Sequence, residues 1–362
     1  MKLYFVTNEY MDKKSGVKKK IDDQVHAFKK FSFDTEIITD DHKKILKKNM
    51  NIAKKIPYNK NQVYFFRSVS IFMPFYMKKI KNLSEHNFLI LELPTPLKSV
   101  GKEFEKDNLL KFYVKKLLFN YSFPRVLKYF DLILEYSTDF DKYTKNHNER
   151  ILNINNGINI EKIPVKDKND SDDINLISVA NNSKWHGYDR VLHGLAKYYK
   201  DKPEKKVYYH CVGDGPELSN LKSLAEQLKL EKYVIFYGEK IGEELDKIFD
   251  YSDLALGSLA SHRKFILKTS ALKNREYCAR GIPFIIICDD DDFPKSFKYV
   301  HRIPPDDNPV DVSEIIEFYK KIRNDDYIGE MRKYAQENLT WEKKLDPVVK
   351  KIKNSNFFNK TN

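Results

Sequence analysis

The chain has 362 residues, enough for two domains of ordinary size, and 41% of them are hydrophobic, so each domain can bury a core. No apolar run is long enough to span a membrane, and Cys211, Cys278 and Cys288 lack disulfide or zinc spacing, which argues against a membrane-spanning protein and a disulfide scaffold and fits a reducing cytosol. Residues 1–160 hold 30 Lys and Arg against 18 Asp and Glu, whereas the rest hold 35 against 34, so nearly all of the net charge of +13 lies in the first half. That half is expected to meet a polyanion or an anionic membrane, or else to carry a basic soluble surface.

The first half begins with the order strand, glycine-containing loop, helix, strand, which is typical of a Rossmann-like domain. Strands are predicted at residues 2–6, 34–39, 62–67, 88–93, 131–136 and 151–154, and a helix at 21–30. Two stretches between them, residues 71–81 and 109–129, are both aromatic and basic. The second has Lys111, Lys115 and Lys116 beside a bulky apolar run, so it is predicted either to attach to an anionic membrane surface or to pack on the sheet with a solvated lysine face.

The charged segment 165–173 holds a single large hydrophobic residue and is the predicted linker. Beyond it, strands and helices alternate regularly, which predicts a second parallel α/β domain. The predicted strands are 174–180, 207–212, 234–237, 254–258 and 284–288, and the predicted helices are 190–199, 216–230, 241–249, 272–280, 312–322, 328–339 and 341–352.

Residues 268–288 carry the clearest chemical pattern. Thr269 and Ser270 are hydroxyl residues ahead of a run of helix formers, so they are predicted N-caps. The predicted helix 272–280 is followed by a glycine and by an apolar run that suits a buried strand. The open N–H groups of a helix start bind anions, and Glu276 inside the helix can accept hydrogen bonds from a sugar diol. These features predict a site for a nucleotide diphosphate sugar; the alternative is an ordinary αβ unit with a solvent-facing glutamate.

Five motifs occur in a fixed order between residues 155 and 283. They are Asn155-Asn156-Gly157-Ile158, His186-Gly187-Tyr188-Asp189-Arg190, Val212-Gly213-Asp214-Gly215-Pro216-Glu217-Leu218, Val234-Ile235-Phe236-Tyr237-Gly238 and Glu276-Tyr277-Cys278-Ala279-Arg280-Gly281-Ile282-Pro283. With these motifs the second half resembles the retaining family-4 glycosyltransferases of the GT-B fold. Gly213 and Gly215 suit a tight strand-to-helix turn that lets backbone approach a ligand closely.

The resemblance implies an α/β fold with two Rossmann-like domains that face each other across a cleft, and a C-terminal helix that crosses back to the first domain. Residues 1–165 with 341–358 would bind the acceptor, and residues 174–340 would bind the nucleotide sugar. The implied donor contacts are Gly16, Asn182, His186, Gly213, Asp214, Gly238, Ser270, Ala271, Leu272 and Glu276. The resemblance implies no metal and no cofactor; the co-substrate is a nucleotide sugar, with a UDP-sugar favoured.

Several positions depart from the family pattern. Lys268 stands where the family has the first of two glutamates, and Asn181 and His186 stand where it has an arginine and a lysine. We expect Arg263, Lys264 and Lys268 to take over the diphosphate, unless they form a solvated basic loop.

The family's cleft histidine is also missing. In its place, Glu92 is the ionisable residue near the end of the predicted strand 88–93. It is predicted either to contact the acceptor or to be buried against Arg67.

The activity that the resemblance implies is that of a retaining, metal-independent hexosyltransferase (EC 2.4) of a bacterium. It would move a sugar from a UDP- or GDP-sugar to a lipid-linked or growing cell-surface glycan, at the cytoplasmic face of the inner membrane and alongside other glycosyltransferases. The missing Arg, Lys, Glu and His leave an alternative open, a catalytically inactive GT-B subunit that partners an active transferase. The basic charge also suggests nucleic acid, but the nucleotide-sugar motifs and the lack of an RNA-binding signature argue against it.

Overall fold

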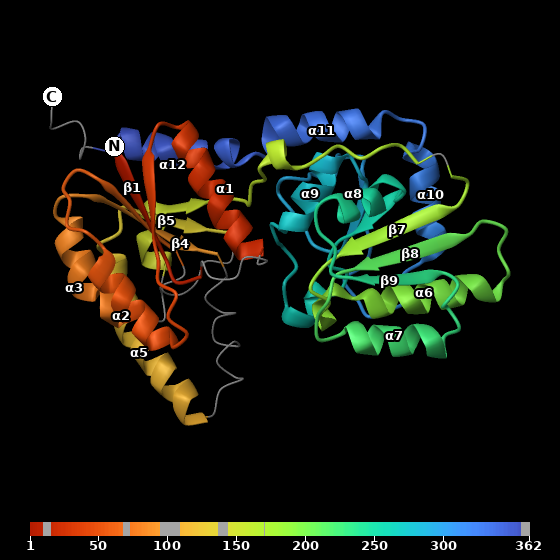
Figure 1. Cartoon of the computed structure of the whole chain (residues 1–362), viewed down its shortest axis with the longest axis horizontal. Coiled ribbons are helices and arrows are strands. Elements are labelled where there is room, and N and C mark those ends of the chain that lie inside the picture. The colour runs from red at the N-terminus through yellow and green to blue at the C-terminus, as the bar shows by residue number, and fades with distance from the viewer. Residues whose placement is uncertain (10–15, 68–72, 95–108, 137–143, 170, 356–362) are drawn as a thin grey trace. The chain divides into compact units, whose positions relative to one another are not determined.

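The structure is a computed structural model that describes residues 1–9, 16–67, 73–94, 109–136, 144–169 and 171–355. The chain divides into two compact units (Figure 1). Unit 1 comprises Met1–Asn156 and Trp341–Asn362, and unit 2 comprises Gly157–Thr340. Each unit is built on a six-stranded sheet in which neighbouring strands are parallel.

The sheet of unit 1 has the strand order β2-β1-β3-β4-β5-β6. Its strands are β1 (Lys2–Thr7), β2 (Asp34–Ile38), β3 (Val63–Arg67), β4 (Phe88–Leu93), β5 (Leu132–Glu135) and β6 (Ile151–Asn153). Every residue of β3 and β4 is buried, because helices cover both faces of the sheet. This explains why these strands are nearly continuous apolar runs and lack the alternation of a half-exposed strand.

Among the described residues, the helices that flank this sheet are α1 (Gly16–Lys30), α2 (Ile45–Lys55), α3 (Met73–Ser84), α5 (Leu109–Leu127) and α12 (Trp341–Lys353). Helices α1 and α12 cover one face, and α2, α3 and α5 cover the other, as Figure 1 shows. The C-terminal helix α12 places Trp341, Leu345 and Val348 on one side, where they pack with Phe28 of α1 into a shared core. The predicted return of this helix to the first domain is thus confirmed.

The sheet of unit 2 has the strand order β12-β11-β10-β7-β8-β9. Its strands are β7 (Ile174–Val179), β8 (Val207–Val212), β9 (Val234–Gly238), β10 (Leu254–Leu256), β11 (Phe284–Ile286) and β12 (Val300–Arg302). Its helices are α6 (Tyr188–Lys200), α7 (Leu218–Gln227), α8 (Glu243–Asp250), α9 (Leu272–Arg280), α10 (Val312–Ile322) and α11 (Tyr327–Asn338). One continuous core joins the sheet to helices on both faces. The predicted arrangement of two α/β units, each with a parallel sheet, is confirmed.

The fold differs from the sequence predictions at the domain boundary and in two elements. The boundary between the units lies after Asn156, earlier than the predicted linker at 165–173. That charged segment is part of unit 2, because the Lys166 N–H donates to the Arg280 carbonyl at 2.9 Å and the Asn169 amide lies 3.3 Å from the Asp253 carboxylate. Helix α2 and strand β12 were not predicted.

Candidate functional site

The sheet of unit 2 has a topological switch point between β7 and β10. From β7 the chain proceeds to β8 and β9 on one side, and then to β10, β11 and β12 on the other. Ligands of open parallel sheets bind outside the carboxyl ends of the strands at such a point. The residues that follow β7 and β10, together with the starts of α6 and α9, therefore form the candidate functional site.

The turn after β8 packs directly against the residues after β7. Gly213 and Gly215 have φ values of +113° and +135°, and a Cβ at Gly213 would lie 1.9 Å from the Ala180 carbonyl oxygen. The Asn182 N–H donates to the Asp214 carbonyl at 2.5 Å, and the Asn182 side chain donates to the Gly213 carbonyl at 3.3 Å. The close backbone approach that these glycines permit is therefore made by the protein's own chain.

Gly238 ends β9 at the same edge of the sheet and accepts a hydrogen bond from the Gly213 N–H at 2.7 Å. Its φ is +67°, and nothing lies within 4 Å of a Cβ built there. Glycine at this position therefore serves the backbone conformation, and it leaves open space beside it.

His186 is buried between β7 and α6. Its Nδ1 accepts a hydrogen bond from the Ser183 N–H at 3.1 Å, and its ring stacks on Tyr188 with the centroids 5.5 Å apart. Burial, together with the charges of Lys273 and Lys264, lowers the pKa of His186 to about 2. The ring is therefore neutral at neutral pH and does not replace the charge of the family's lysine.

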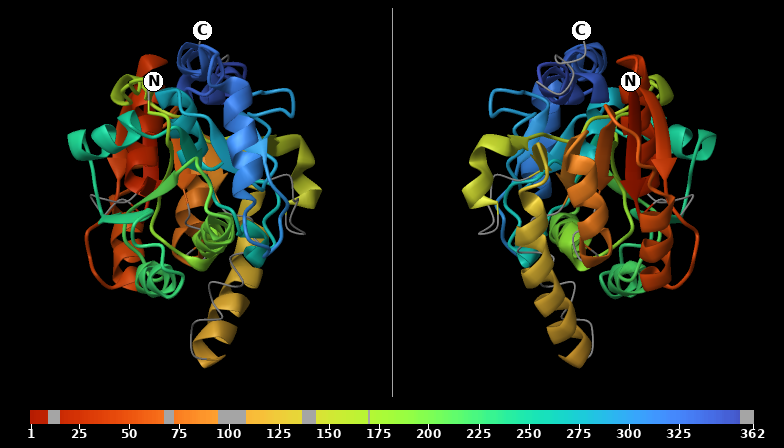
Figure 2. Two further views of the ribbon diagram at one scale, coloured as in Figure 1. Left: turned by 90° about the vertical axis from the view of Figure 1, so that its right-hand side faces the viewer. Right: turned by 90° about the vertical axis from the view of Figure 1, so that its left-hand side faces the viewer.

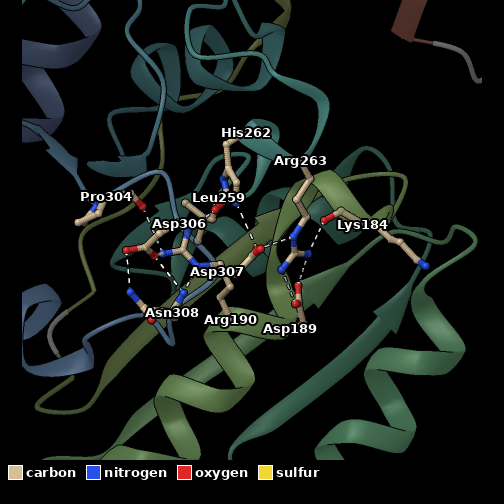
Figure 3. A network of polar contacts seen from close by, with 10 residues as sticks. All are labelled: Lys184, Asp189, Arg190, Leu259, His262, Arg263, Pro304, Asp306, Asp307 and Asn308. Atoms are coloured by element: carbon tan, nitrogen blue, oxygen red, sulfur yellow. Dashed lines mark hydrogen bonds and ion pairs between the residues drawn. The ribbon is translucent and has the colours of Figure 1, made fainter. Parts of the chain in front are cut away.

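Arg190 ties the start of α6 to two loops (Figure 3). Its guanidinium donates to the Asn308 carbonyl at 2.7 Å, to the Leu259 carbonyl, and to the Asp306 carboxylate at 2.8 Å. Beside it, Gly187 has a φ of +68°, and a Cβ there would lie 2.7 Å from the Leu259 backbone. The loop after β7 is thus held tightly against the loop after β10.

Arg263, one of the predicted phosphate-binding cations, lies in the same network (Figure 3). It makes a bidentate pair with the Asp189 carboxylate at 3.0 and 2.7 Å and bonds Asp307 at 2.7 Å. These hydrogen bonds, that with Asp189 foremost, raise the pKa of Arg263. Two carboxylates compensate the charge of Arg263, and its hydrogen bonds join the loop after β10 to the start of α6 and to Asp307.

The other two predicted cations also have partners. The Lys264 ammonium lies 3.1 Å from the centroid of the Trp185 ring, and Lys268 forms an ion pair with Asp291 at 2.7 Å. The structure thus brings the three predicted cations to the loop after β10, each with an intramolecular contact. Their role toward a diphosphate stays a prediction.

Helix α9 begins at Leu272, and its N-cap is Ala271, which makes no side-chain capping bond. The prediction that Thr269 or Ser270 caps this helix is wrong. The Thr269 N–H donates instead to the Asp289 carbonyl at 2.9 Å, so the chain is still extended at this point. The N-cap residue Ala271 has no side chain that could accept from the first N–H groups of α9, which suits an anion site at this helix start.

Glu276 lies in the second turn of α9, with 23% of its side chain exposed. Arg280, one turn further on, donates to it at 3.1 and 3.0 Å and also bonds Asp246 at 2.7 Å. Glu276 is therefore oriented by a neighbouring arginine at the accessible edge of the helix.

Arg275, on the buried side of α9, is fully enclosed. Its guanidinium bonds both Asp290 and Asp292. Burial alone would lower the pKa of Arg275, but the charges and hydrogen bonds of the two aspartates together outweigh it and raise the pKa. This triad attaches α9 to the loop after β11.

Lys273, in the first turn of α9, was not identified from the sequence. Its ammonium lies 3.3 Å from the Tyr188 hydroxyl and 5.8 Å from the centroid of that ring. Part of the side chain stays exposed, yet burial of the amine lowers the pKa of Lys273 to about 7. Within the described part of the chain, no carboxylate lies within ion-pair distance of it. The sequence offered no signal beyond the position of a lysine three residues before Glu276.

A pocket of about 160 Å³ lies beside this site, between the starts of α6 and α7. Asp189, Glu217, Asn220 and Arg263 contribute to its lining. It is smaller than the pockets of about 300–1,000 Å³ that hold small-molecule ligands, so it does not by itself accommodate a nucleotide sugar.

In unit 1, Glu92 is fully buried near the carboxyl end of β4. It is paired with Arg67, lies 3.4 Å from the Lys20 ammonium, and accepts hydrogen bonds from Tyr136 and Gln24. Burial alone would raise the pKa of Glu92, but the charges of Arg67 and Lys20 outweigh it and lower the pKa to about 2. The predicted pairing with Arg67 is present, and a contact with an acceptor stays a prediction.

Gly16, the remaining predicted donor contact, is the first residue of α1 in unit 1, with nothing within 4 Å of a Cβ built there. Among the described residues, no group of three or more His, Cys, Asp and Glu side chains is placed to hold a metal ion. The described helices include none that combines the length and the apolar composition needed to cross a bilayer.

Comparison with known proteins gives the class of this fold. Residues 159–323, which lie in unit 2, match the family model of glycosyl transferases group 1. A search of curated proteins finds no match.

Solved structures resemble the chain over nearly its whole length. HepE of Anabaena in complex with UDP has a TM-score of 0.65 and 13% identity, with 98% of this chain and 100% of that chain covered. A glycosyltransferase of Rickettsia africae has a TM-score of 0.66 and 14% identity, with 98% and 99% covered. The lipopolysaccharide outer core galactosyltransferase WaaB has a TM-score of 0.63 and 12% identity, with 96% and 99% covered. The two-domain α/β fold predicted from the sequence, that of GT-B glycosyltransferases, is confirmed.

Proposed function

We propose that the protein is a retaining glycosyltransferase that takes its sugar from a nucleotide diphosphate sugar. The observation that carries the proposal is the start of α9: an uncapped helix end at the switch point of the unit that matches the glycosyl transferases group 1 model, with Glu276 one turn further on. The helix start suits the two phosphates and Glu276 suits the ribose diol. A UDP-sugar is the favoured donor, and the similar HepE structure contains UDP.

In this proposal the two units have separate roles. Unit 2 binds the donor through the loops after β7, β8 and β10, and unit 1 binds the acceptor. The leaving phosphate oxygen accepts the acceptor's proton on the face where the new bond forms, so the anomeric configuration is retained. The protein contributes by positioning both substrates and by stabilising the charge that grows on the diphosphate.

The proposed acceptor is a lipid-linked or growing surface glycan, because helix α5 suits a membrane surface. Its residues Tyr113, Leu117 and Tyr121 lie on one side, and 62%, 72% and 57% of their surfaces are exposed. The opposite side, with Phe119 and Phe123, is buried in unit 1. Figure 2 shows the beginning of α5 projecting beyond the other helices of its unit. Exposed aromatic rings on a basic domain fit the headgroup region of an anionic bilayer.

A transfer assay tests the proposal. The purified chain would first be screened by thermal shift against UDP-glucose, UDP-N-acetylglucosamine and GDP-mannose. The sugar that stabilises it would then be offered with a lipid-linked acceptor, and the anomeric configuration of the product read by NMR. Stabilisation by no nucleotide sugar contradicts the proposal, and a product of inverted configuration contradicts retention.

One observation favours the alternative, an inactive partner subunit. The predicted replacement cations Arg263 and Lys268 are already paired with aspartates. Such a subunit would bind nucleotide sugar without hydrolysing or transferring it alone, and activity would appear only when an active transferase is added.

A further inference from the structure

The cations of unit 2 that lie around the switch point differ in how their charge is compensated. Arg263 has Asp189 and Asp307, Lys268 has Asp291, and Arg275, the most enclosed of them, has Asp290 and Asp292. These pairs hold the loops and α9 in place without any ligand. These three cations are thus compensated by carboxylates, and Lys264, on the loop after β10, lies over the Trp185 ring.

Lys273 is different. It is on the first turn of α9, and its ammonium reaches across to the hydroxyl of Tyr188, the first residue of α6. The titratable groups that act on it or feel its charge are Tyr188, His186 and Cys211, none of which is an anion at neutral pH. A partly enclosed ammonium without an anion is costly, because burial removes its hydration and nothing replaces it.

Lys273 lies close to the N-terminal ends of two helices, and such ends carry partial positive charge. Helices α6 and α9 both start at this edge, and the N-cap residues Gly187 and Ala271 make no side-chain capping bond. By contrast, Asp311 and Asp326 cap α10 and α11 with their carboxylates. Asp189 adds a carboxylate to the first turn of α6, whereas the first turn of α9 has none, so the start of α9 and the Lys273 ammonium together favour an anion.

We propose that Lys273 is the cation of unit 2 that binds the donor's diphosphate, in place of the arginine and lysine that the chain lacks at Asn181 and His186. This inference rests on the proposed function, since it takes a nucleotide sugar as the ligand. The diphosphate would accept hydrogen bonds from the Lys273 ammonium and from the first N–H groups of α9. Tyr188 would position the lysine through its hydroxyl.

A lysine that binds the diphosphate should change its protonation when the donor binds, whereas a purely structural lysine should not. In the free protein the Lys273 amine is only partly protonated at pH 7, because burial lowers its pKa to about 7. A bound diphosphate supplies the missing anion and restores the charged form. Donor binding should therefore take up a proton at Lys273, with most of a proton taken up at pH 8 and little at pH 6.

The test uses the full chain and the nucleotide sugar that stabilises it most in the panel of UDP-glucose, UDP-N-acetylglucosamine and GDP-mannose. The phosphates of these sugars do not titrate between pH 6 and 8, so calorimetry in buffers of different ionisation enthalpy reports protons taken up by the protein. Lys273→Met should weaken binding by about ten- to a hundredfold, the range of a charge-assisted hydrogen bond, and should abolish the proton uptake. Lys273→Arg should recover part of the affinity without the uptake.

Lys268→Met tests the competing assignment of the diphosphate to Lys268, which lies at the same edge and is paired with Asp291. Lys320→Met is the matched control, because Lys320 lies on α10 and forms an exposed pair with Glu317. It should change affinity by less than about threefold, as expected of an exposed pair. Loss of folding does not confound the test. Removal of an amine whose pKa is lowered in the folded state should raise the melting temperature of the ligand-free Lys273→Met variant near pH 7.

The outcomes separate the two proposals. If the wild type binds none of the nucleotide sugars, the proposed function fails and this assignment fails with it. If the wild type binds one and Lys273→Met binds it equally well, or with the same proton uptake, only the assignment of Lys273 is overturned. A large loss in Lys268→Met with none in Lys273→Met would assign the diphosphate to the loop after β10 instead.

Discussion

The two sheets carry buried positive charge at their carboxyl edges in different ways. In unit 1, Arg67 and Lys20 share the buried carboxylate of Glu92, and Arg67 also lies 3.2 Å from Glu9. In unit 2, Lys273 has a tyrosine hydroxyl and no carboxylate among the described residues. At the first edge each cation has a carboxylate of the protein within ion-pair distance, although burial still lowers the pKa of Lys20 to about 7. At the second edge a ligand can supply the anion that Lys273 lacks among the described residues.

A comparison within α9 strengthens this contrast. Arg275, two residues after Lys273, is fully buried and has two aspartates. Two carboxylates thus compensate one cation of this helix, and the other has none within ion-pair distance among the residues that the structure describes. Burial of a cation by itself thus says little about function; the presence or absence of its counter-ion distinguishes a structural charge from a binding one.

The largest effect on stability is expected at the buried triad of Arg275, Asp290 and Asp292. Arg275→Met leaves Asp290 and Asp292 without their buried cation, and breaking such a pair costs about 3–5 kcal/mol. Urea unfolding of the variant should show a loss of this size. The triple variant that adds Asp290→Asn and Asp292→Asn should recover a large part of it. A loss below about 1 kcal/mol would mean that the triad contributes little to stability.

The next effect is on the pH dependence of stability, and it concerns Glu92 with its partners Arg67 and Lys20 in unit 1. The pKa of Glu92 is about 2 in the folded protein and about 4.3 in an unfolded chain, so the ionised form stabilises the fold by about 3 kcal/mol. Because the folded pKa is the lower one, this stability is present above pH 4–5 and is lost as the pH falls toward 2. Unfolding of Glu92→Gln should be correspondingly less sensitive to pH in this window. Glu9→Gln, at the partly exposed partner of Arg67, is the control and should keep most of the wild-type slope.

A smaller effect, on donor affinity, is expected at Glu276 of α9 in unit 2. If Glu276 holds the ribose diol, Glu276→Gln should weaken donor binding by about 1.5–3 kcal/mol and leave the fold intact, because the amide keeps one acceptor oxygen and loses the charge. Asp246→Asn is the matched control, since Asp246 is the other carboxylate bonded to Arg280. Calorimetry with the stabilising nucleotide sugar measures the donor affinity of the wild type and of both variants. Equal affinity in the wild type and Glu276→Gln would make Glu276 a partner of Arg280 alone.

The buried strands and close backbone contacts could be predicted from the sequence, whereas the ion pairs and the environment of Lys273 could not. Buried parallel strands leave continuous apolar runs, and the close backbone contact at Gly213 leaves a glycine, so both can be recognised locally. Ion pairs cannot: Arg263 meets Asp307, which is 44 residues away, only after folding. In the sequence Lys273 resembles any lysine on a helix, and only the fold shows that none of the described carboxylates lies within ion-pair distance of it.

The smallest effect concerns the net positive charge of residues 1–160 and the exposed side of α5. Leu117 and Tyr121 are exposed on one side of this helix, and Arg125 stacks on Tyr121 with its guanidinium carbon 3.9 Å from the ring centroid. Burial of one exposed leucine in a bilayer interface is worth about 1.5–3 kcal/mol at most, and each nearby lysine or arginine adds about 1 kcal/mol on anionic lipid.

Co-sedimentation with phosphatidylglycerol vesicles should therefore show binding that falls as salt shortens the Debye length. Leu117→Ser with Tyr121→Ser should reduce it, and Lys115→Glu with Lys116→Glu should reduce it more at low salt than at high salt. Neutral phosphatidylcholine vesicles are the control for charge. The opposite result, no sedimentation with anionic vesicles at low salt, would remove the membrane from the proposal. The acceptor would then be a soluble glycan, because the exposed side of α5 would have no bilayer to bring it to a lipid-linked one.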